Sequence, residues 1–318
     1  MKKVVTGIDV GGTFTKLGII DRSGQIYAED AIQTDSYLDI DSYIDKLTST
    51  IRNLLKESGG VDLQGIGIGA PNANYYKGTI EHAPNLNWKG VIHFADLLKK
   101  NFDVPVVMTN DANAAALGEM MYGSAKEMKD FIVVTLGTGL GSGIVVNGGV
   151  VYGHDGFAGE MGHLTIVENG RQCGCGRMGC LEAYASATGL KRTVCELLAK
   201  SDGESVLKKE NLEKLTAKEI SEAATEGDQI ALKAFEITGK MLGESLADTV
   251  ALFSPEAIFL FGGLANAGEL IFRPTKVYME KKLMPIFRDK VKILPSGLTL
   301  ANAAVMGSSG LIWKEIID

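Results

Sequence analysis

The sequence predicts an α/β protein built from two domains. Apolar strands at residues 3–20, 65–69 and 104–108 alternate with helical patterns at 41–57 and 113–121. At Phe131 the opening strand–turn–strand pattern starts again, which indicates an internal duplication. A chain of 318 residues, 45% of them hydrophobic, is also longer than one simple core requires.

The restart of the pattern sets the predicted domain ranges. Residues 1–118 are expected to form a small domain, joined by a C-terminal helix at about 299–318. Residues 119–298 are expected to form a large domain with a glycine-rich loop. Within it we predict helices at 181–199, 216–226 and 229–253 and a buried strand at 257–261.

Composition excludes several classes of function. The net charge is −7, and no basic cluster exceeds a Lys-Lys pair, which argues against a nucleic-acid partner. No apolar run is long enough to span a membrane, and Asp9 and paired glycines interrupt any signal peptide, so we expect a cytoplasmic protein. Of four cysteines, three cluster, which favours a metal over disulfides. The fourth, Cys195, is predicted to be a core residue of a helix.

Three glycine turns that follow strands predict contacts with a nucleotide. A buried strand brings Asp9 to its end just before the first turn, and Gly262 and Gly263 would let an adenosine ring approach. The two phosphate turns are Gly11, Gly12 and Thr13, and Gly137, Thr138 and Gly139. Backbone N–H groups in such turns can surround an anion, although Gly-Gly is also common in ordinary β-hairpins. The second turn is neither a dinucleotide fingerprint nor a P-loop, because a strand follows it and no Gly-Lys-Ser/Thr does.

Asn110 and Asp111 lie between a strand and a helix. Asp111 is a candidate base that accepts the proton of an attacking hydroxyl, and it is equally a candidate helix N-cap. In either case the helix N-terminus is expected to keep Asp111 ionised with a low pKa.

A cluster of soft ligands follows the second turn. His163, Cys173, Cys175 and Cys180 match a tetrahedral Cys₃His zinc site, and no ligand position is left for water, so the zinc should be structural. Such a site would fix a loop next to Glu160, His163 and Glu182. Carboxylates accept hydrogen bonds from sugar hydroxyls, and a metal-bound imidazole can donate from its other nitrogen.

Together these segments resemble the ROK family of repressors and sugar kinases. The matching stretches are DVGGTFTKLGII at 9–20, NDANAAALGE at 110–119, LGTGLGSGIVVNG at 136–148, GHDGFAGEMGHLTI at 153–166 and CGCGRMGCLEAYAS at 173–186. The resemblance implies an actin-like ATPase (ribonuclease H-like) fold with a nucleotide and sugar cleft between two domains. It also implies transfer of the ATP γ-phosphate to a hexose with Mg²⁺, and the wording of the last two stretches looks most like glucokinases acting on D-glucose.

The resemblance also implies roles for individual residues. The phosphate and adenosine segments would be Asp9, Gly11, Gly12, Thr13 and Lys16, then Gly137, Thr138 and Gly139, then Gly262 and Gly263. The sugar ligands would be Asn110, Asp111, Glu160, His163 and Glu182, with Asp111 as catalytic base and zinc on His163, Cys173, Cys175 and Cys180. Asn72 departs from the family by replacing a glycine, but Asn tolerates a positive φ, so the turn is expected to survive.

Alternatives remain open at this point. Another sugar could be the substrate, such as N-acetylmannosamine, N-acetylglucosamine, mannose or allose, and polyphosphate could replace ATP. A DNA-binding repressor is not expected, because too few residues precede Asp9 for a helix-turn-helix. A sugar sensor without catalysis is a further alternative. A homodimer or homotetramer is expected.

Overall fold

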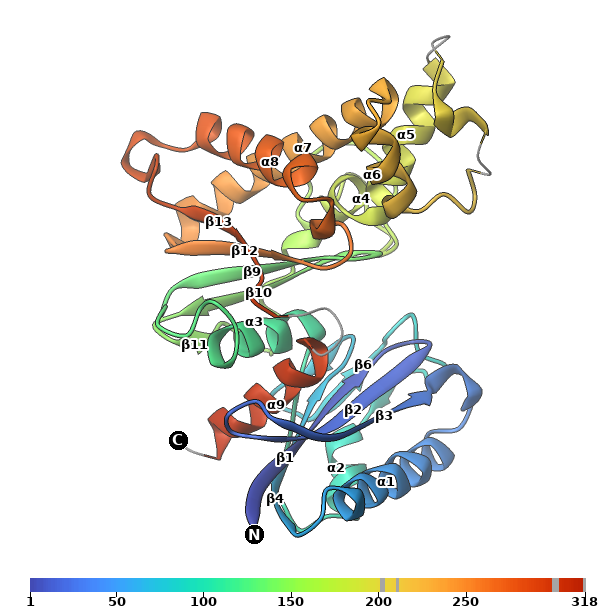
Figure 1. The fold of residues 1–318 in the computed structure, drawn as a ribbon, viewed down its shortest axis with the longest axis vertical. Coiled ribbons are helices and arrows are strands. Elements are labelled where there is room, and N and C mark those ends of the chain that lie inside the picture. Colours follow the sequence, from blue (N-terminus) through green and yellow to red (C-terminus); the bar gives the residue numbers. More distant parts are fainter. Residues whose placement is uncertain (201–203, 210–211, 299–302, 317–318) are drawn as a thin grey trace. The chain divides into compact units, whose positions relative to one another are not determined.

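A computed structural model describes residues 1–200, 204–209, 212–298 and 303–316 (Figure 1). The chain forms two compact units. Unit 1 consists of Met1–Met128, Gly143–Gly159 and Ser296–Asp318, and unit 2 of Lys129–Ser142 and Glu160–Pro295. The domain ranges 1–118 with 299–318, and 119–298, stay a prediction; residues 299–302 and 317–318 lie outside the described residues.

Unit 1 is built on a five-stranded sheet with the order β3-β2-β1-β4-β8. Its strands are β1 (Lys2–Val10), β2 (Phe14–Asp21), β3 (Ile26–Gln33), β4 (Val61–Gly69) and β8 (Val106–Thr109). The first three are antiparallel, and β4 and β8 run parallel to β1. Asp9 pairs with Gly69 and Gly69 with Thr109, so the carboxyl ends of three parallel strands meet at one edge.

Helices cover this sheet. The helices of unit 1 are α1 (Ile40–Glu57), α2 (Phe94–Lys99), α3 (Asp111–Met121) and α9 (Ala303–Glu315). Helix α1 buries Tyr43, Leu47 and Ile51 in one core with strand residues such as Ile8. Helix α9 packs on α3, β1 and β4. A side chain at Gly7 or Gly67 would overlap the α9 backbone, so these glycines permit the close packing that the Ala- and Gly-rich sequence of α9 predicts.

Helix α2, strand β3 and a small second sheet of unit 1 were not expected from the sequence. Strand β3 has a mixed pattern of exposed and partly buried residues, so it shows no clean alternation. A small antiparallel sheet of β5 (Ala73–Asn74), β6 (Thr79–Glu81) and β7 (Val91–Ile92) also appears. Strands this short give no periodic signal.

The second sheet has the order β11-β10-β9-β12-β13. Its strands are β9 (Phe131–Leu136), β10 (Leu140–Val146), β11 (Gly149–Val150), β12 (Ala257–Phe261) and β13 (Lys292–Pro295). Strand β12 is parallel to both β9 and β13. Taken in chain order, each sheet runs third-second-first-fourth-fifth. The shared topology confirms the internal duplication that the restart at Phe131 predicts.

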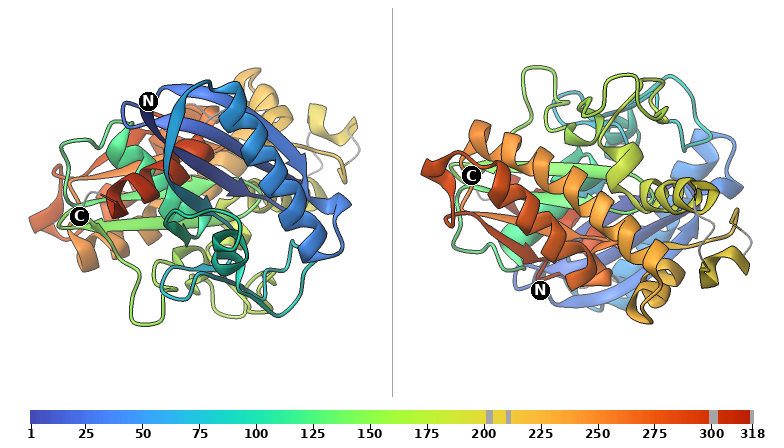
Figure 2. Two further views of the ribbon diagram at one scale, coloured as in Figure 1. Left: turned by 90° about the horizontal axis from the view of Figure 1, so that it is seen from below. Right: turned by 90° about the horizontal axis from the view of Figure 1, so that it is seen from above.

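The helices of unit 2 are α4 (Glu182–Ala185), α5 (Ala187–Lys200), α6 (Ala217–Thr225), α7 (Gln229–Phe253) and α8 (Glu269–Lys282), which Figure 2 shows from two sides. The helix predicted at 181–199 is interrupted, because Ser186 is extended and its Oγ bonds Glu182 O. Cys195 is only partly buried on α5, so its predicted place in the core was wrong. Helix α8 was missed because Pro274 lies inside it.

Short 3₁₀ turns complete the described elements. They are η1 (Thr34–Ser36), η2 (Met161–His163), η3 (Val206–Lys209), η4 (Ala265–Ala267) and η5 (Pro285–Phe287). Within the described ranges, no helix has the length and apolar character needed to cross a bilayer.

Candidate functional site

The edge of the first sheet brings two predicted acidic residues together. Asp9 lies next to the end of β1, and Asp111 begins α3 directly after β8. Gly69, at the end of β4, lies between them, and a Cβ there would come 3.9 Å from the Asp111 Cα. In α/β sheets the carboxyl edge of parallel strands is the usual place for ligands.

Asn110, rather than Asp111, caps helix α3. The Asn110 Oδ1 accepts a hydrogen bond from Asn113 N at 2.7 Å, while Asp111 is already the first helical residue. The alternative in which Asp111 is the N-cap was therefore wrong. Asp111 as a whole residue is exposed, although neighbouring protein atoms surround its carboxyl group, which accepts a local hydrogen bond from Ala112 N at 2.9 Å.

Both carboxyl groups have raised pKa values. Surrounding protein atoms desolvate Asp111 and raise its pKa, and this outweighs the opposing hydrogen bonds from the helix N-terminus. The expectation of a low Asp111 pKa was thus wrong. Burial also raises the pKa of Asp9 to about 6, with a further contribution from the charge of Asp111, while the exposed Lys16 acts in the opposite direction.

The first glycine turn is closed tightly. Gly11 N donates to Phe14 O at 3.0 Å, and Thr34 N donates to Thr13 O at 2.8 Å. A Cβ on Gly12 would lie 2.6 Å from Asn85 O, so this position accepts glycine alone. The strand ladder ends at the pair Val10–Thr15, which leaves the N–H groups of Gly12 and Thr13 outside it.

Asn72 adopts the conformation expected of it. Its φ is 50°, in the left-handed region, and its Nδ2 donates to Glu81 O at 3.1 Å. The turn at the end of β4 therefore survives the replacement of the family glycine, as predicted.

The second glycine turn is held by residues that follow it in the sequence. Gly137 N donates to Gly139 O at 3.0 Å, and Ala187 N donates to Gly137 O at 2.9 Å. Leu140 N donates to Glu182 Oε2 at 2.9 Å. The other Glu182 oxygen, Oε1, accepts from the Cys173 thiol at 3.5 Å. Glu182, predicted as a sugar ligand, thus links this turn to the cysteine loop.

Gly262 has no room for a side chain, whereas the surface beside Gly263 is open. Gly262 has φ of 106°, and a Cβ there would lie 2.6 Å from Leu136 O, at the end of β9. Leu264 N also donates to Leu136 O at 3.0 Å. Gly263 is exposed and a Cβ would meet no atom within 4 Å. Both glycines therefore lie beside the second turn, and Gly263 leaves open surface there.

The four predicted zinc ligands converge. The potential ligand atoms of His163, Cys173, Cys175 and Cys180 all lie within 4.8 Å of one another. The Cys175 and Cys180 sulfurs are 3.8 Å apart, and Cys173 Sγ is 3.7 Å from His163 Nδ1. Tetrahedral zinc with bonds of about 2.3 Å to sulfur requires sulfur pairs about 3.8 Å apart, so the cluster fits zinc. His163 Nε2 faces away from the sulfurs, 3.9 Å from Glu160 Oε2.

The acidic pair fits a hard divalent cation. Mg²⁺ prefers carboxylate and water oxygens. Burial, and to a smaller extent the charge of Asp111, raise the Asp9 pKa, and a cation on the Asp9 carboxylate would offset both effects. The donor chemistry of this edge therefore suits Mg²⁺ bound with a nucleotide.

Comparison with known proteins identifies the family. A model described as "ROK family" matches residues 5–315. The chain belongs to the ROK family. A glucokinase from Halalkalibacterium halodurans is 36% identical over 317 residues, covering 97% of this chain and 94% of the relative. A xylose repressor from Bacillus spizizenii is 30% identical over 315 residues, covering 98% of this chain and 77% of the repressor.

A solved ROK structure supports the fold. The ROK family glucokinase from Streptomyces griseus, in complex with glucose and AMPPNP, matches with a TM-score of 0.78 and 32% identity. The match covers 97% of this chain and 98% of that protein. The actin-like ATPase fold predicted from the motifs is thereby confirmed. The relatives support a ROK sugar kinase and also include regulators.

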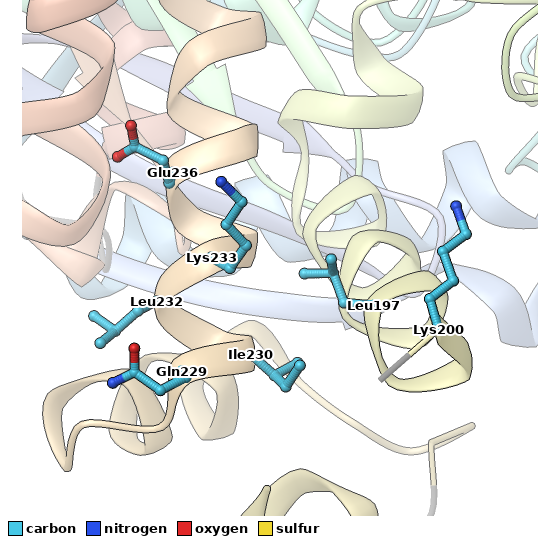
Figure 3. Close-up of a pocket in the computed structure, with 7 residues that line it drawn as sticks. All are labelled: Leu197, Lys200, Gln229, Ile230, Leu232, Lys233 and Glu236. Carbon is cyan, nitrogen blue, oxygen red and sulfur yellow. The ribbon is translucent and has the colours of Figure 1, made fainter. Parts of the chain in front are cut away.

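A groove away from these residues lies between α5 and α7, with a volume of about 670 Å³ (Figure 3). Its lining residues are Leu197, Lys200, Gln229, Ile230, Leu232, Lys233 and Glu236. None of them was predicted as a site residue, and the groove has no convergent catalytic groups.

Proposed function

We propose that this ROK protein is a cytoplasmic hexose kinase that transfers the γ-phosphate of ATP to the 6-hydroxyl of D-glucose. The observation that supports catalysis most is the state of Asp111. The residue is exposed at the carboxyl edge of the first sheet, its carboxylate is not used as a helix cap, and desolvation by neighbouring protein atoms raises its pKa. These are the properties of a general base placed beside a phosphate-binding turn.

The proposed reaction uses Asp111 to take the proton of the sugar hydroxyl. The hydroxyl oxygen then forms a bond to the γ-phosphorus, and the bond from that phosphorus to the bridging oxygen of ADP breaks. The raised pKa of Asp111 makes its carboxylate a stronger proton acceptor than an ordinary aspartate. Ala112 N fixes Oδ1 at 2.9 Å and so orients the other oxygen for the substrate.

The first turn would bind phosphate through the N–H groups of Gly12 and Thr13, which lie outside the strand ladder. Asp9 would hold Mg²⁺, directly or through water. When bound, this ion would offset negative charge on the phosphates. The second turn, Gly137 to Gly139, and Gly262 with Gly263 would contact other parts of the nucleotide.

On the sugar side, we propose that Asn110, Glu160, His163 and Glu182 bind hydroxyl groups. The Asn110 oxygen caps α3, so its Nδ2 is the group left to donate. With His163 Nδ1 directed at Cys173, Nε2 is the nitrogen that remains for a hydroxyl. The zinc on the Cys₃His set would be structural.

Glucose is favoured over other sugars because the glucokinase relative is matched over 94% of its length at 36% identity. The second candidate function is a sugar-responsive regulator. It is favoured by the xylose repressor relative and by a ROK transcriptional regulator structure that matches with a TM-score of 0.88 and 25% identity. A regulator needs sugar binding but has no use for a base at Asp111.

A coupled assay that detects ADP tests the proposal. Purified protein is given ATP, Mg²⁺ and one of glucose, mannose, allose, N-acetylglucosamine or N-acetylmannosamine, and polyphosphate replaces ATP in a parallel series. We expect the highest kcat/KM with glucose and ATP. Turnover with another sugar would correct the substrate. Glucose binding by calorimetry without turnover on any sugar would support the regulator.

A further inference from the structure

Arg171 lies two residues before the first cysteine of the cluster and is nearly buried, with 12% of its side chain exposed. Its guanidinium group has five N–H donors. Nε donates to Glu196 Oε1 at 2.8 Å. Nη2 donates to Glu196 Oε2 at 2.8 Å and to Thr193 Oγ1 at 2.9 Å. Nη1 donates to the backbone carbonyls Ala183 O at 3.0 Å and Gly189 O at 3.1 Å. Every donor is therefore used.

The backbone of Arg171 is fixed as well. Its N–H donates to the Tyr184 hydroxyl at 2.8 Å, and its carbonyl accepts from Gly179 N at 2.8 Å. The guanidinium carbon also lies 4.5 Å from the centre of the Tyr184 ring. One residue thus connects two ends of the cysteine loop with helices α4 and α5.

These contacts lie immediately beside the functional residues. Gly179 precedes the ligand Cys180, and Ala183 follows Glu182. The loop itself has little regular structure, since its only bridges among the described residues pair Gln172 with Met178 and Thr165 with Cys180. A long-range anchor is needed to fix such a segment.

We infer that Arg171 is a positioning residue that holds the Cys₃His ligands and Glu182 in one arrangement. The metal part of this inference depends on the cluster geometry alone. The sugar part rests on the proposed function, because it assumes that Glu182 contacts the substrate.

The contacts of the Arg171 guanidinium group differ in how strongly they hold the loop. Glu196 is 52% exposed, so solvent screens its ion pair with Arg171 and the pair contributes little to stability. The hydrogen bonds from the planar guanidinium group to two backbone carbonyls and to Thr193 matter more. A lysine ammonium cannot replace them, because it does not have five donors in fixed directions. The main effect of Arg171 is therefore geometric rather than electrostatic.

The test compares Arg171→Lys with Arg192→Lys. Arg192 is exposed on α5 and donates a hydrogen bond to the same loop, to Gln172 O at 2.7 Å, which makes it a matched control. Transfer of zinc to a chromogenic chelator is followed after elemental analysis. We expect release from Arg171→Lys to be roughly 10- to 100-fold faster than from wild type, as for other residues that orient metal ligands. Equal release rates in the two variants, or wild-type protein without zinc, would overturn the inference.

A second variant covers the case in which Arg171→Lys does not fold. Thr193→Val keeps the bonds from Nη1 to Ala183 O and Gly189 O but removes the Thr193 Oγ1 acceptor of Nη2, so zinc release should be faster than in Arg192→Lys and slower than in Arg171→Lys. Release as slow as in Arg192→Lys would count against the anchor.

Sugar kinetics separate this inference from the proposed function. In an active enzyme, Arg171→Lys should raise the glucose KM roughly tenfold while kcat changes less than about threefold, since binding rather than proton transfer is disturbed. An unchanged KM with fast zinc release would reject the sugar part. If the wild-type protein phosphorylates no sugar, the proposed function fails, and zinc release still decides the metal part.

Discussion

The two strand–turn–strand segments of this chain share a topology and differ in chemistry. In each, a three-residue glycine turn joins the central strand of a five-stranded sheet to its neighbour, residues 11–13 in one and 137–139 in the other. The residue before the last in the central strand is Asp9 in β1 and Thr135 in β9. A carboxylate in one copy thus corresponds to a hydroxyl in the other.

The two side chains behave differently. Thr135 Oγ1 accepts a hydrogen bond from Gly141 N at 3.2 Å and so stabilises its own hairpin. Asp9 is partly buried near a second acid, Asp111, which raises its pKa. The acid beside the second turn is Glu182, and both of its oxygens accept hydrogen bonds from the protein. Both copies of the hairpin therefore have a turn suited to an anion. Among the described residues, only the first turn lies beside an acidic pair, Asp9 and Asp111, that could exchange protons or bind a cation. This difference supports the proposal that Asp111 of unit 1 is the proton acceptor.

The largest expected effect is the loss of kcat when Asp111 is replaced, compared with the small loss when Thr135 of the second hairpin is replaced. Asp111→Asn should lower kcat by roughly 10²- to 10⁴-fold, because an amide cannot accept the proton. Its unfolding free energy should stay within about 0.5 kcal/mol of wild type or rise, because Asn110 still caps α3. Thr135→Val should lose one neutral hydrogen bond and lower kcat less than about tenfold. Steady-state kinetics and urea unfolding measure both, and wild-type turnover in Asp111→Asn would refute the assignment.

Loss of the metal should affect the second region first. Cys175→Ser should reduce zinc from about one per chain to a trace, because ligand binding and loop folding are coupled. The loop around 163–180 should then become sensitive to proteolysis. Cys195→Ser, outside the cluster and partly buried on α5, is the control and should keep its zinc. Elemental analysis with limited digestion checks this, and a zinc-loaded Cys175→Ser protein would exclude the Cys₃His set.

Gly12 and Gly137, one glycine from each turn, should differ in their tolerance of alanine. A Cβ on Gly12 would lie 2.6 Å from a backbone oxygen, whereas a Cβ on Gly137 meets no atom within 4 Å. Gly12→Ala should therefore lose about 1–3 kcal/mol of unfolding free energy, and Gly137→Ala should change by less than about 0.5 kcal/mol. Denaturation without ligands measures this difference. Equal losses in both variants would show that the turns are packed alike.

The effect that depends most on conditions concerns pH. The folded-state pKa of Asp9 is about 6, above its ordinary value of 3.8. The native state therefore binds more protons between these values, and stability falls as pH rises from 3.8 to 6. Asp9→Asn should remove a penalty of about 1–3 kcal/mol at pH 8 and change little at pH 4. Urea unfolding with a metal chelator tests this; an Asp9→Asn variant that is less stable than wild type at pH 8 would contradict the raised pKa.

The same pKa predicts how activity depends on pH. As pH falls below about 6, Asp9 loses its charge, and Asp111, whose pKa is also raised, takes up protons more readily than an ordinary aspartate, so kcat/KM should fall as pH drops through this range. Asp111→Asn should lower the pKa of Asp9 by removing a neighbouring charge. Carboxyl titration by NMR in wild type and variant measures the shift, and no change would show that the two acids do not interact.

Regular elements with clear periodicity were predictable from the sequence. The apolar spacing of residues 41–57 and 229–253 gave helices whose ends match α1 and α7 within about a residue, because one apolar face per helix is a local property. Helix α8 was missed because Pro274 obscures its pattern, and the two- and three-residue strands of the small sheet are too short to show one.

The sequence by itself determined the duplicated topology, the ligand types of the candidate metal site and the positions of the glycine turns. Each of these depends on residue identity and on spacing along the chain. Only the tertiary structure decided which residue caps α3 and whether the pKa of Asp111 rises or falls. It also showed that Arg171 uses all five of its donors. These properties depend on groups far apart in the sequence, since desolvation and hydrogen-bond competition act through space and leave no local pattern.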